Sequence, residues 1–207
     1  MNRNRNTKEI LVESFKELLL NIPFGKITVK MITDKAGVIR TTFYNYFKDK
    51  YEIFEYILEE ELFIVLDALI ENDLESEALK MIFTYFDKNR SFYKEAFKTV
   101  GQNSFEEILS KKIFKLCKKL IEKHRLKIDI ENEALTIDSI AKYYTIGIVY
   151  VLKMCLLDYY DEKITSEEIY DAYIYLITHN MDIIYGGGLS ANVHGGSILA
   201  VDDIELM

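Results

Sequence analysis

The chain has 207 residues, of which 49% are hydrophobic, so it is long enough and apolar enough to bury a sizeable core. Its net charge of −8 argues at first against a nucleic-acid-binding protein, and its first residues, MNRNRNTKE, lack the apolar stretch of a secretory signal. No run approaches the ~18 apolar residues of a membrane span, so we expect a cytoplasmic protein with no membrane contact.

The charges are unevenly distributed along the chain. Residues 1–50, which we call the head, hold ten Lys or Arg and five Asp or Glu, a net charge of +5. The remainder holds sixteen basic and twenty-nine acidic residues, a net charge of −13. A basic head on an acidic chain favours a protein that presents one end to phosphate groups.

Helix breakers are scarce in most of the chain. Pro23 is the single proline, and four of the nine glycines precede residue 186. The sequence therefore predicts an all-α fold. The first helix is expected over 7–21, with Thr7 as its N-cap and with Pro23 and Gly25 after its end.

The stretch TVKMITDKAGVIRTTFYNYFKDK, residues 28–50, has the pattern of a helix-turn-helix. Gly37 stands where a sharp turn needs a residue that tolerates positive φ. In the second helix Phe43 and Phe47 are four residues apart, so they share a buried face. The first helix has one apolar stripe at helical spacing, formed by Val29, Ile32 and Ala36.

The second helix presents polar residues on the face opposite its phenylalanines. Thr41 and Asn45 lie on that outward face, and an asparagine amide can pair with adenine. Arg40 stands at the start of the helix, where a guanidinium can bind a guanine edge, a contact worth about 1–3 kcal/mol in discrimination. This polar face is typical of a helix that enters a groove of DNA.

Several short motifs in the head together resemble the helix-turn-helix signature of TetR-type transcriptional regulators. They are Thr28-Val29, Ala36-Gly37-Val38, Thr42-Phe43-Tyr44 and Tyr46-Phe47, followed by Lys50. Two positions depart from the pattern: Ile39 stands where the family usually has a capping serine, and Thr33 where it usually has alanine. Loss of a capping side chain costs about 0.5–2 kcal/mol of local stability.

The resemblance also implies sequence-specific binding to double-stranded operator DNA, with a role for each residue at that surface. The base readers would be Arg40, Thr41 and Asn45. The phosphate contacts would be Thr28, Lys30, Thr42, Tyr44, Tyr46 and Lys50. The alternative is that the two tyrosines are half-buried core aromatics and the lysines are merely solvated.

The residues that follow the head are expected to form a helical body at 51–185. A long helix opens at 48–50 and runs to about residue 71, and further helices are expected near 75–89, 91–99, 103–126, 132–159 and 166–185. Residues 186–207 hold five of the nine glycines, so a flexible tail is expected there.

The stretches SFYKEAF (91–97) and GQNSF (101–105) resemble the C-terminal domain of a Firmicutes-type TetR subgroup related to dihydroxyacetone kinase regulators. This resemblance implies a ligand-binding and dimerisation domain and an unknown small-molecule effector. Aromatic residues of the body could line its pocket, although aromatics at helical spacing are more often core. The candidates are Phe83, Phe86, Tyr93, Phe97, Phe105, Phe114, Tyr143 and Tyr144.

The last two long helices are apolar on nearly every face. Residues 143–157 leave almost no polar side, so that helix is expected to be buried all round. The family explanation is a four-helix bundle formed by these helices with a second subunit, which would make the protein a homodimer. A monomer whose central helix is wrapped by its neighbours is the alternative.

We find no catalytic constellation and no pattern for a metal or cofactor. His124, His179 and His194 are far apart, and Cys117 and Cys155 are expected to be buried free thiols. The sequence thus predicts a non-enzymatic, effector-responsive repressor that acts as a homodimer. The alternative is a TetR-shaped coactivator that binds a protein partner and not DNA.

Overall fold

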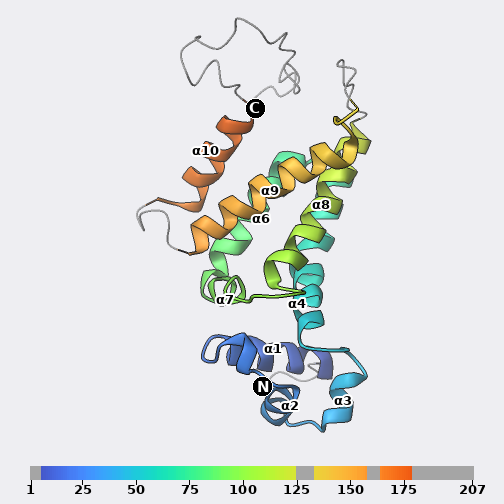
Figure 1. The fold of residues 1–207 in the computed structure, drawn as a ribbon, viewed down its shortest axis with the longest axis vertical. Helices are drawn as coiled ribbons and strands as arrows, with labels where there is room; N and C mark the ends of the chain where they lie inside the picture. Colours follow the sequence, from blue (N-terminus) through green and yellow to red (C-terminus); the bar gives the residue numbers. More distant parts are fainter. Residues whose placement is uncertain (1–5, 125–132, 158–163, 179–207) are drawn as a thin grey trace, which may run out of the picture.

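The computed structural model describes residues 6–124, 133–157 and 164–178, and their regular structure is entirely helical (Figure 1). The predicted all-α fold is therefore confirmed for this part of the chain. The predicted tail, 186–207, lies outside the described residues. The head contains α1 (Thr7–Leu19), the 3-10 turn η1 (Phe24–Lys26), α2 (Val29–Ala36) and α3 (Arg40–Tyr44).

The body begins with three helical segments that run end to end and continue the long helix predicted from residue 50. They are α4 (Tyr51–Leu58), the π-helical turn η2 (Glu59–Phe63) and α5 (Ile64–Glu71). The helices that follow are α6 (Glu75–Lys88), α7 (Arg90–Ala96), α8 (Phe105–Lys123), α9 (Ile137–Leu156) and α10 (Ser166–Thr178). Residues 75–89, 91–99 and 166–178 are helical nearly as predicted, whereas α9 begins five residues after the predicted start at 132. The predicted helix ends at 126, 159 and 185 lie outside the described residues.

Side-chain caps fix the starts of the first two helices of the head. Asn6 caps α1, because its Oδ1 accepts a hydrogen bond from the backbone N–H of Lys8 at 3.3 Å. The prediction that Thr7 is this cap is wrong, since Thr7 is already the first helical residue. Thr28 caps α2 through a 3.2 Å hydrogen bond from the N–H of Met31.

The head lies at one end of the molecule, and α10 lies towards the other (Figure 1). The helix α4 leads from the head into the body, where α8 and α9 pack along each other. One hydrophobic core extends through both regions, so the division at residue 50 separates two parts of one packed structure.

Aromatic rings join the head to the body. The Phe54 ring of α4 lies 5.1 Å from the ring of Phe15 in α1 and 5.3 Å from that of Phe24 in η1. The same ring lies 5.3 Å from that of Phe105 at the start of α8. Full burial of one such side chain contributes about 1.5–3 kcal/mol, so this cluster fixes how the head sits on α4.

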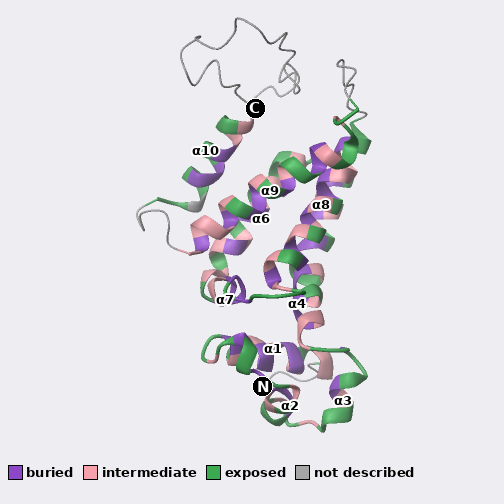
Figure 2. Ribbon diagram, in the orientation of Figure 1, coloured by how far each residue is buried: buried purple, intermediate pink, exposed green. Residues whose placement is uncertain are grey.

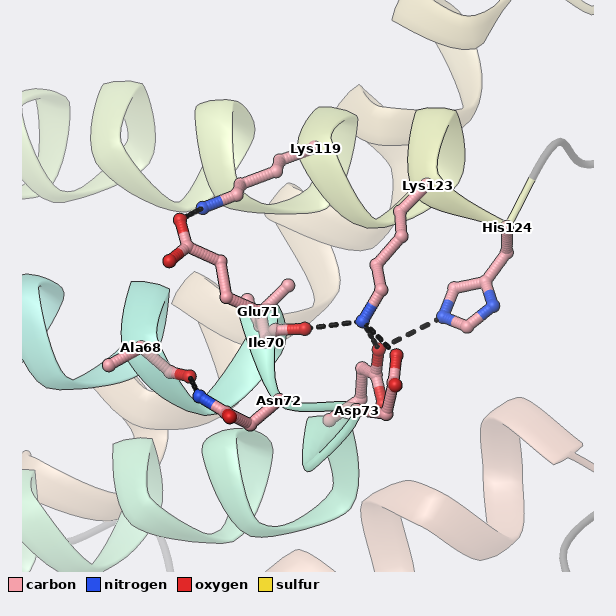
Figure 3. Close-up of polar contacts among 9 residues, drawn as sticks. Ala68, Ile70, Glu71, Asn72, Asp73, Lys119, Lys123 and His124 are labelled. Atoms are coloured by element: carbon pink, nitrogen blue, oxygen red, sulfur yellow. Dashed lines mark hydrogen bonds and ion pairs between the residues drawn. The ribbon is translucent and has the colours of Figure 1, made fainter.

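Polar contacts at the end of α5 and the start of α6 join these helices to the end of α8 (Figure 3). The Lys123 ammonium donates to the carbonyl of Ile70 and pairs with Asp73 at 2.5 Å and Glu75 at 2.8 Å. His124 Nε2 lies 3.1 Å from the same Glu75 oxygen. The hydrogen bond from Lys123 lowers the pKa of the Asp73 carboxyl.

Within the described part of the chain, the helix α9 is exposed along one side (Figure 2). Its described neighbours do not wrap it as the monomer alternative expects, and its burial by a second subunit stays a prediction. Tyr143, Ile146 and Tyr150 are 72%, 69% and 59% exposed. Since they are three and four residues apart, they form one continuous apolar stripe, which we call the α9 stripe. The opposite side packs into the core through Ile140, Ala141, Thr145, Ile148, Val149, Leu152 and Leu156.

Candidate DNA-binding surface

The turn between α2 and α3 is set by Gly37, as predicted. Its φ of +69° lies in the left-handed region, which side chains with a Cβ rarely adopt. The N–H of Val38 then donates to the carbonyl of Thr33 at 3.0 Å, which closes the end of α2. The Thr33 hydroxyl is buried but donates to the carbonyls of Val29 and Lys30, so this departure from alanine is accommodated.

The helix α3 is short and is held by two phenylalanines. Phe43 is fully buried and Phe47 is 2% exposed, and their rings lie 5.7 Å apart. The helix ends at Tyr44, and Asn45 is its C-cap rather than an interior residue. Its N-cap, Ile39, supplies no side-chain hydrogen bond, as the sequence predicted.

The predicted base readers all lie on the surface of the head, where α3 has exposed, half-buried and buried residues (Figure 2). Arg40, Thr41 and Asn45 are exposed. The Arg40 guanidinium donates to the Tyr44 hydroxyl, with Nη2 at 2.9 Å and Nε at 3.3 Å. A guanidinium has five N–H donors, so Arg40 keeps donors for another partner.

The predicted phosphate contacts have more varied environments. Tyr44 and Tyr46 are 48% and 38% exposed, so neither is a core aromatic. Thr28 is the exposed cap of α2, and Thr42 is half-buried. The ammonium of Lys30 is exposed and pairs with Asp34 one helical turn away, at 2.5 Å.

Lys50 has a structural role that sequence reasoning missed. Its Nζ donates to the carbonyls of Phe24 at 2.6 Å and Ile27 at 2.8 Å, and lies 4.1 Å from the centre of the Phe24 ring. Partial burial lowers the pKa of this ammonium. Two of its three hydrogens are therefore used to hold η1 against the start of α4, and one is left for a phosphate.

Comparison with known protein families decides the identity of this fold. The model for bacterial regulatory proteins of the tetR family matches residues 16–57, and a model for a transcriptional regulator C-terminal region matches residues 73–179. The chain belongs to the TetR family of transcriptional regulators. TetR-family regulators are not enzymes, which agrees with the lack of a catalytic motif in the sequence.

Individual members of the TetR family are similar to this chain in sequence and in structure. The activator DhaS of the dhaKLM operon from Lactococcus lactis is 27% identical over 121 residues, which cover 55% of this chain and 64% of that protein. The match thus spans less than two thirds of that relative. A solved structure of DhaS has a TM-score of 0.53 and 25% identity, with 81% of this chain and 92% of that chain covered. A TetR-family regulator from Syntrophomonas wolfei has a TM-score of 0.61 at 17% identity, covering 90% of this chain and 98% of that chain, which shows the shared fold.

The aromatic residues predicted to line an effector pocket of this TetR body have the surroundings of core residues. Phe86, Tyr93, Phe97 and Phe105 are less than 5% exposed, and their rings pack against one another. Tyr143 belongs to the exposed α9 stripe and does not share the packing of these four aromatics, so its place in a pocket stays a prediction. Phe114 and Tyr144 are half-buried, so the pocket stays a prediction.

Phe83 and Phe86 do border a small cavity between α6, α7, α9 and α10. Its volume of ≈ 10 Å³ has room for about one water molecule. Arg90 stands at its side and donates from Nη1 to the carbonyl of Cys155 at 2.6 Å, a polar contact that no sequence pattern indicated. The lining residues are Phe83, Phe86, Asp87, Arg90, Leu152, Cys155, Leu156 and Ile169.

Both cysteines are free thiols, as predicted. Burial raises the pKa of Cys117 and of Cys155 to about 11, so neither is a reactive thiolate at neutral pH. Within residues 6–124, 133–157 and 164–178, no three His, Cys, Asp or Glu side chains form a group that could hold a metal ion.

By length and composition alone, α9 could cross a membrane. In this fold it packs along α8 instead, and Lys153 near its end pairs with Glu106 of α8 at 2.7 Å. It is therefore a packing helix of the TetR body.

Proposed function

We propose that this TetR-family regulator is a cytoplasmic homodimer that represses transcription by sequence-specific binding to operator DNA. A small-molecule effector controls this binding. The observation that carries the proposal is the exposed polar face of α3 on a basic head. Arg40, Thr41 and Asn45 are exposed there. In this proposal residues 1–50 bind DNA and residues 51–185 dimerise and bind the effector.

The base readers and the phosphate contacts divide the work of recognition. The Arg40 guanidinium donates to a guanine edge, either after breaking its hydrogen bond to the Tyr44 hydroxyl or through its remaining N–H donors while that bond is kept. Asn45, at the end of α3, pairs with adenine. Thr28, Lys30, Thr42, Tyr44, Tyr46 and the free hydrogen of Lys50 bind phosphate oxygens and set the register on the duplex.

The α9 stripe supports the homodimer. Exposed aromatic and aliphatic side chains in a continuous row are what an isologous interface buries. Tyr175 and Leu176 of α10, 49% and 59% exposed, add apolar surface on the neighbouring helix. Two copies joined through α9 and α10 would form a four-helix bundle and place two heads on half-sites about 34–36 Å apart.

The effector acts by preferring one of two arrangements of the heads. A ligand shifts such an equilibrium only by its difference in affinity between the two states. The aromatic cluster around Phe54 joins the body to the head, so a movement of α4 changes the position of α3.

A second candidate function is an activator or coactivator. Two observations favour it: the relative DhaS is described as a transcriptional activator, and α3 is a five-residue helix without a side-chain N-cap. In the coactivator version the head binds a protein partner and not DNA.

The test is binding of the full-length protein to the DNA upstream of its own gene, with random DNA as competitor, over a range of salt concentrations. The proposal predicts specific binding whose log affinity falls with log salt by about 0.9 per phosphate contacted. Transcript levels after deletion of the gene give the sign, since loss of a repressor raises them. Weak binding that is equal for genomic and random DNA would favour the coactivator.

A further inference from the structure

Ile39, in the turn between α2 and α3, is 72% exposed. Its backbone is extended, with φ −78° and ψ 152°, and in extended backbone successive side chains point to opposite sides. Because the preceding Val38 packs against the core of the head, Ile39 points outward. The turn lies at the end of the head that faces away from the body (Figure 1).

The surroundings of Ile39 differ from those of the exposed apolar residues in the α9 stripe. Ile146 has two exposed tyrosines beside it in the α9 stripe, a surface suited to another protein chain. Ile39 is followed in sequence by Arg40 and Thr41, which are exposed and polar. Ile39 is therefore an exposed aliphatic side chain beside residues that we propose bind DNA by charge and hydrogen bonds.

An isoleucine at this position stabilises the head neither by burial nor by capping. It is largely in solvent, and it cannot accept the hydrogen bond that a serine or threonine would accept at the N-cap of α3. Positions where a residue breaks local rules with no gain in the fold are the places where function is expected.

We propose that Ile39 reads the C5-methyl group of a thymine in the major groove of the operator. This inference rests on the proposed DNA-binding function of α3. The thymine methyl is the apolar group that base edges display in the major groove, and an aliphatic side chain with no hydrogen-bonding atom can recognise it only by contact. Each half-site then contains a thymine close to the base read by Arg40.

The experiment removes that methyl group and nothing else. Operator half-sites are first selected from random duplex DNA with the full-length protein, and each thymine is then replaced in turn by uracil. Burial of one methyl group corresponds to about a fourfold change in affinity. We expect a loss of about this size at one thymine in each half-site, and little change at the others.

Variants of the protein assign the effect to residue 39. Ile39→Ala should bind the thymine and uracil duplexes equally well. The matched control is Val100→Ala, which shortens an apolar side chain that is 87% exposed in the loop between α7 and α8 of the body. This variant should keep the preference for thymine in full.

A second variant, Ile39→Ser, separates the loss of methyl recognition from unfolding of the head. Its hydroxyl can cap α3, so the melting temperature should be no lower than that of the wild type, while the preference for thymine disappears. The inference is overturned if the wild type ignores the replacement of every thymine, or if Ile39→Ala keeps the preference. Either result leaves the DNA-binding function intact. If instead no sequence is selected from random DNA, the proposed function itself fails, and this inference with it.

Discussion

The hydroxyl groups of Tyr85 and Tyr93 lie 2.7 Å apart and belong to a polar chain that runs from the body to the head. The Tyr85 hydroxyl also donates to Glu61 at 2.9 Å, so Tyr93 is the donor between the two tyrosines. Glu61 lies in the π-helical turn η2, and its other oxygen pairs with Lys16 of α1 at 2.5 Å. This series of polar contacts thus runs from α7 through α6 and η2 to α1, the first helix of the head.

Removing the Tyr93 hydroxyl should destabilise the whole protein. Tyr93 is 1% exposed, and Tyr93→Phe deletes its buried hydrogen bond without changing the ring packing. We expect a loss of about 0.5–1.5 kcal/mol in the free energy of unfolding, measured by urea denaturation. Tyr46→Phe, which alters an exposed tyrosine of the head, is the control and should be close to neutral. Equal stabilities of the two variants would show that the hydrogen bond contributes nothing.

The buried tyrosines also predict a loss of stability at alkaline pH. Burial raises the pKa of Tyr85, Tyr93 and Tyr173 above the usual value. Above about pH 10 the unfolded chain releases these protons while the folded chain keeps them, so stability is full below that pH and falls as the pH rises above it.

The measurement is a titration of tyrosine absorbance, followed beside helix content and urea stability from pH 8 upward. A fraction of the 15 tyrosines should titrate only as the helices unfold. If all of them titrate near pH 10 while the helix content is unchanged, the burial of these hydroxyls in solution is disproved.

The helix-turn-helix was predictable because it is specified locally. The stripe in α2, the turn at Gly37 and the pair Phe43 and Phe47 all lie within 23 residues, and each follows from spacing and backbone geometry. The exposed face of α3 then follows from the buried one. The end of α3 at Tyr44 was not predictable, because no glycine or proline follows Asn45 closely and the length of the helix depends on packing.

The role of Lys50 and the surroundings of the body's aromatics were not predictable. Lys50 binds backbone carbonyls 23 and 26 residues away. Every residue has such a carbonyl, so the sequence does not show which ones a lysine binds. Phe86 and Phe105 each lie on the apolar face of a helix, and that position is the same for a core residue and for a pocket residue. The sequence pattern therefore does not distinguish a core from a pocket. The exposure of Tyr143 shows a similar limit, since an apolar helix face looks alike whether its own chain or a second copy covers it.

Replacing Lys50 should weaken the fold of the head. Lys50→Gln removes two charge-assisted hydrogen bonds to the carbonyls of η1, and because the site is only partly buried we expect a loss of about 1–3 kcal/mol in unfolding free energy. Lys48→Gln makes the same charge change two residues earlier, at an exposed position, and is the matched control. Thermal unfolding compares the two, and a shift shared by both would show that charge alone is responsible.

The α9 stripe predicts how the protein associates. Ile146→Glu places a charge at the centre of the stripe, where a dimer would bury it, and should convert the dimer to a monomer. Ile64→Glu makes the same change at a position on α5 that is 49% exposed, and should leave the dimer intact. Sedimentation equilibrium measures both masses. A wild-type protein that is monomeric at micromolar concentration would refute the interface.

Arg40 and Lys30 should differ in how they affect DNA binding. Arg40→Ala removes the candidate guanine contact, so affinity should become insensitive to one base pair in each half-site, with a loss of about 1–3 kcal/mol in discrimination. Lys30→Ala removes a candidate phosphate contact, so all sequences should weaken alike and the salt slope should fall by about 0.9 for each head.

The control for both variants is Lys111→Ala, which removes a cation on α8 of the body, where it pairs with Glu107 at 2.8 Å. Base preference and salt slope are read from titrations of single-base operator variants at several salt concentrations. The two effects separate because a base edge differs between sequences and a phosphate does not. If Arg40→Ala only reduced the salt slope, Arg40 would be a phosphate contact, and the reading of guanine would have to come from another residue of α3.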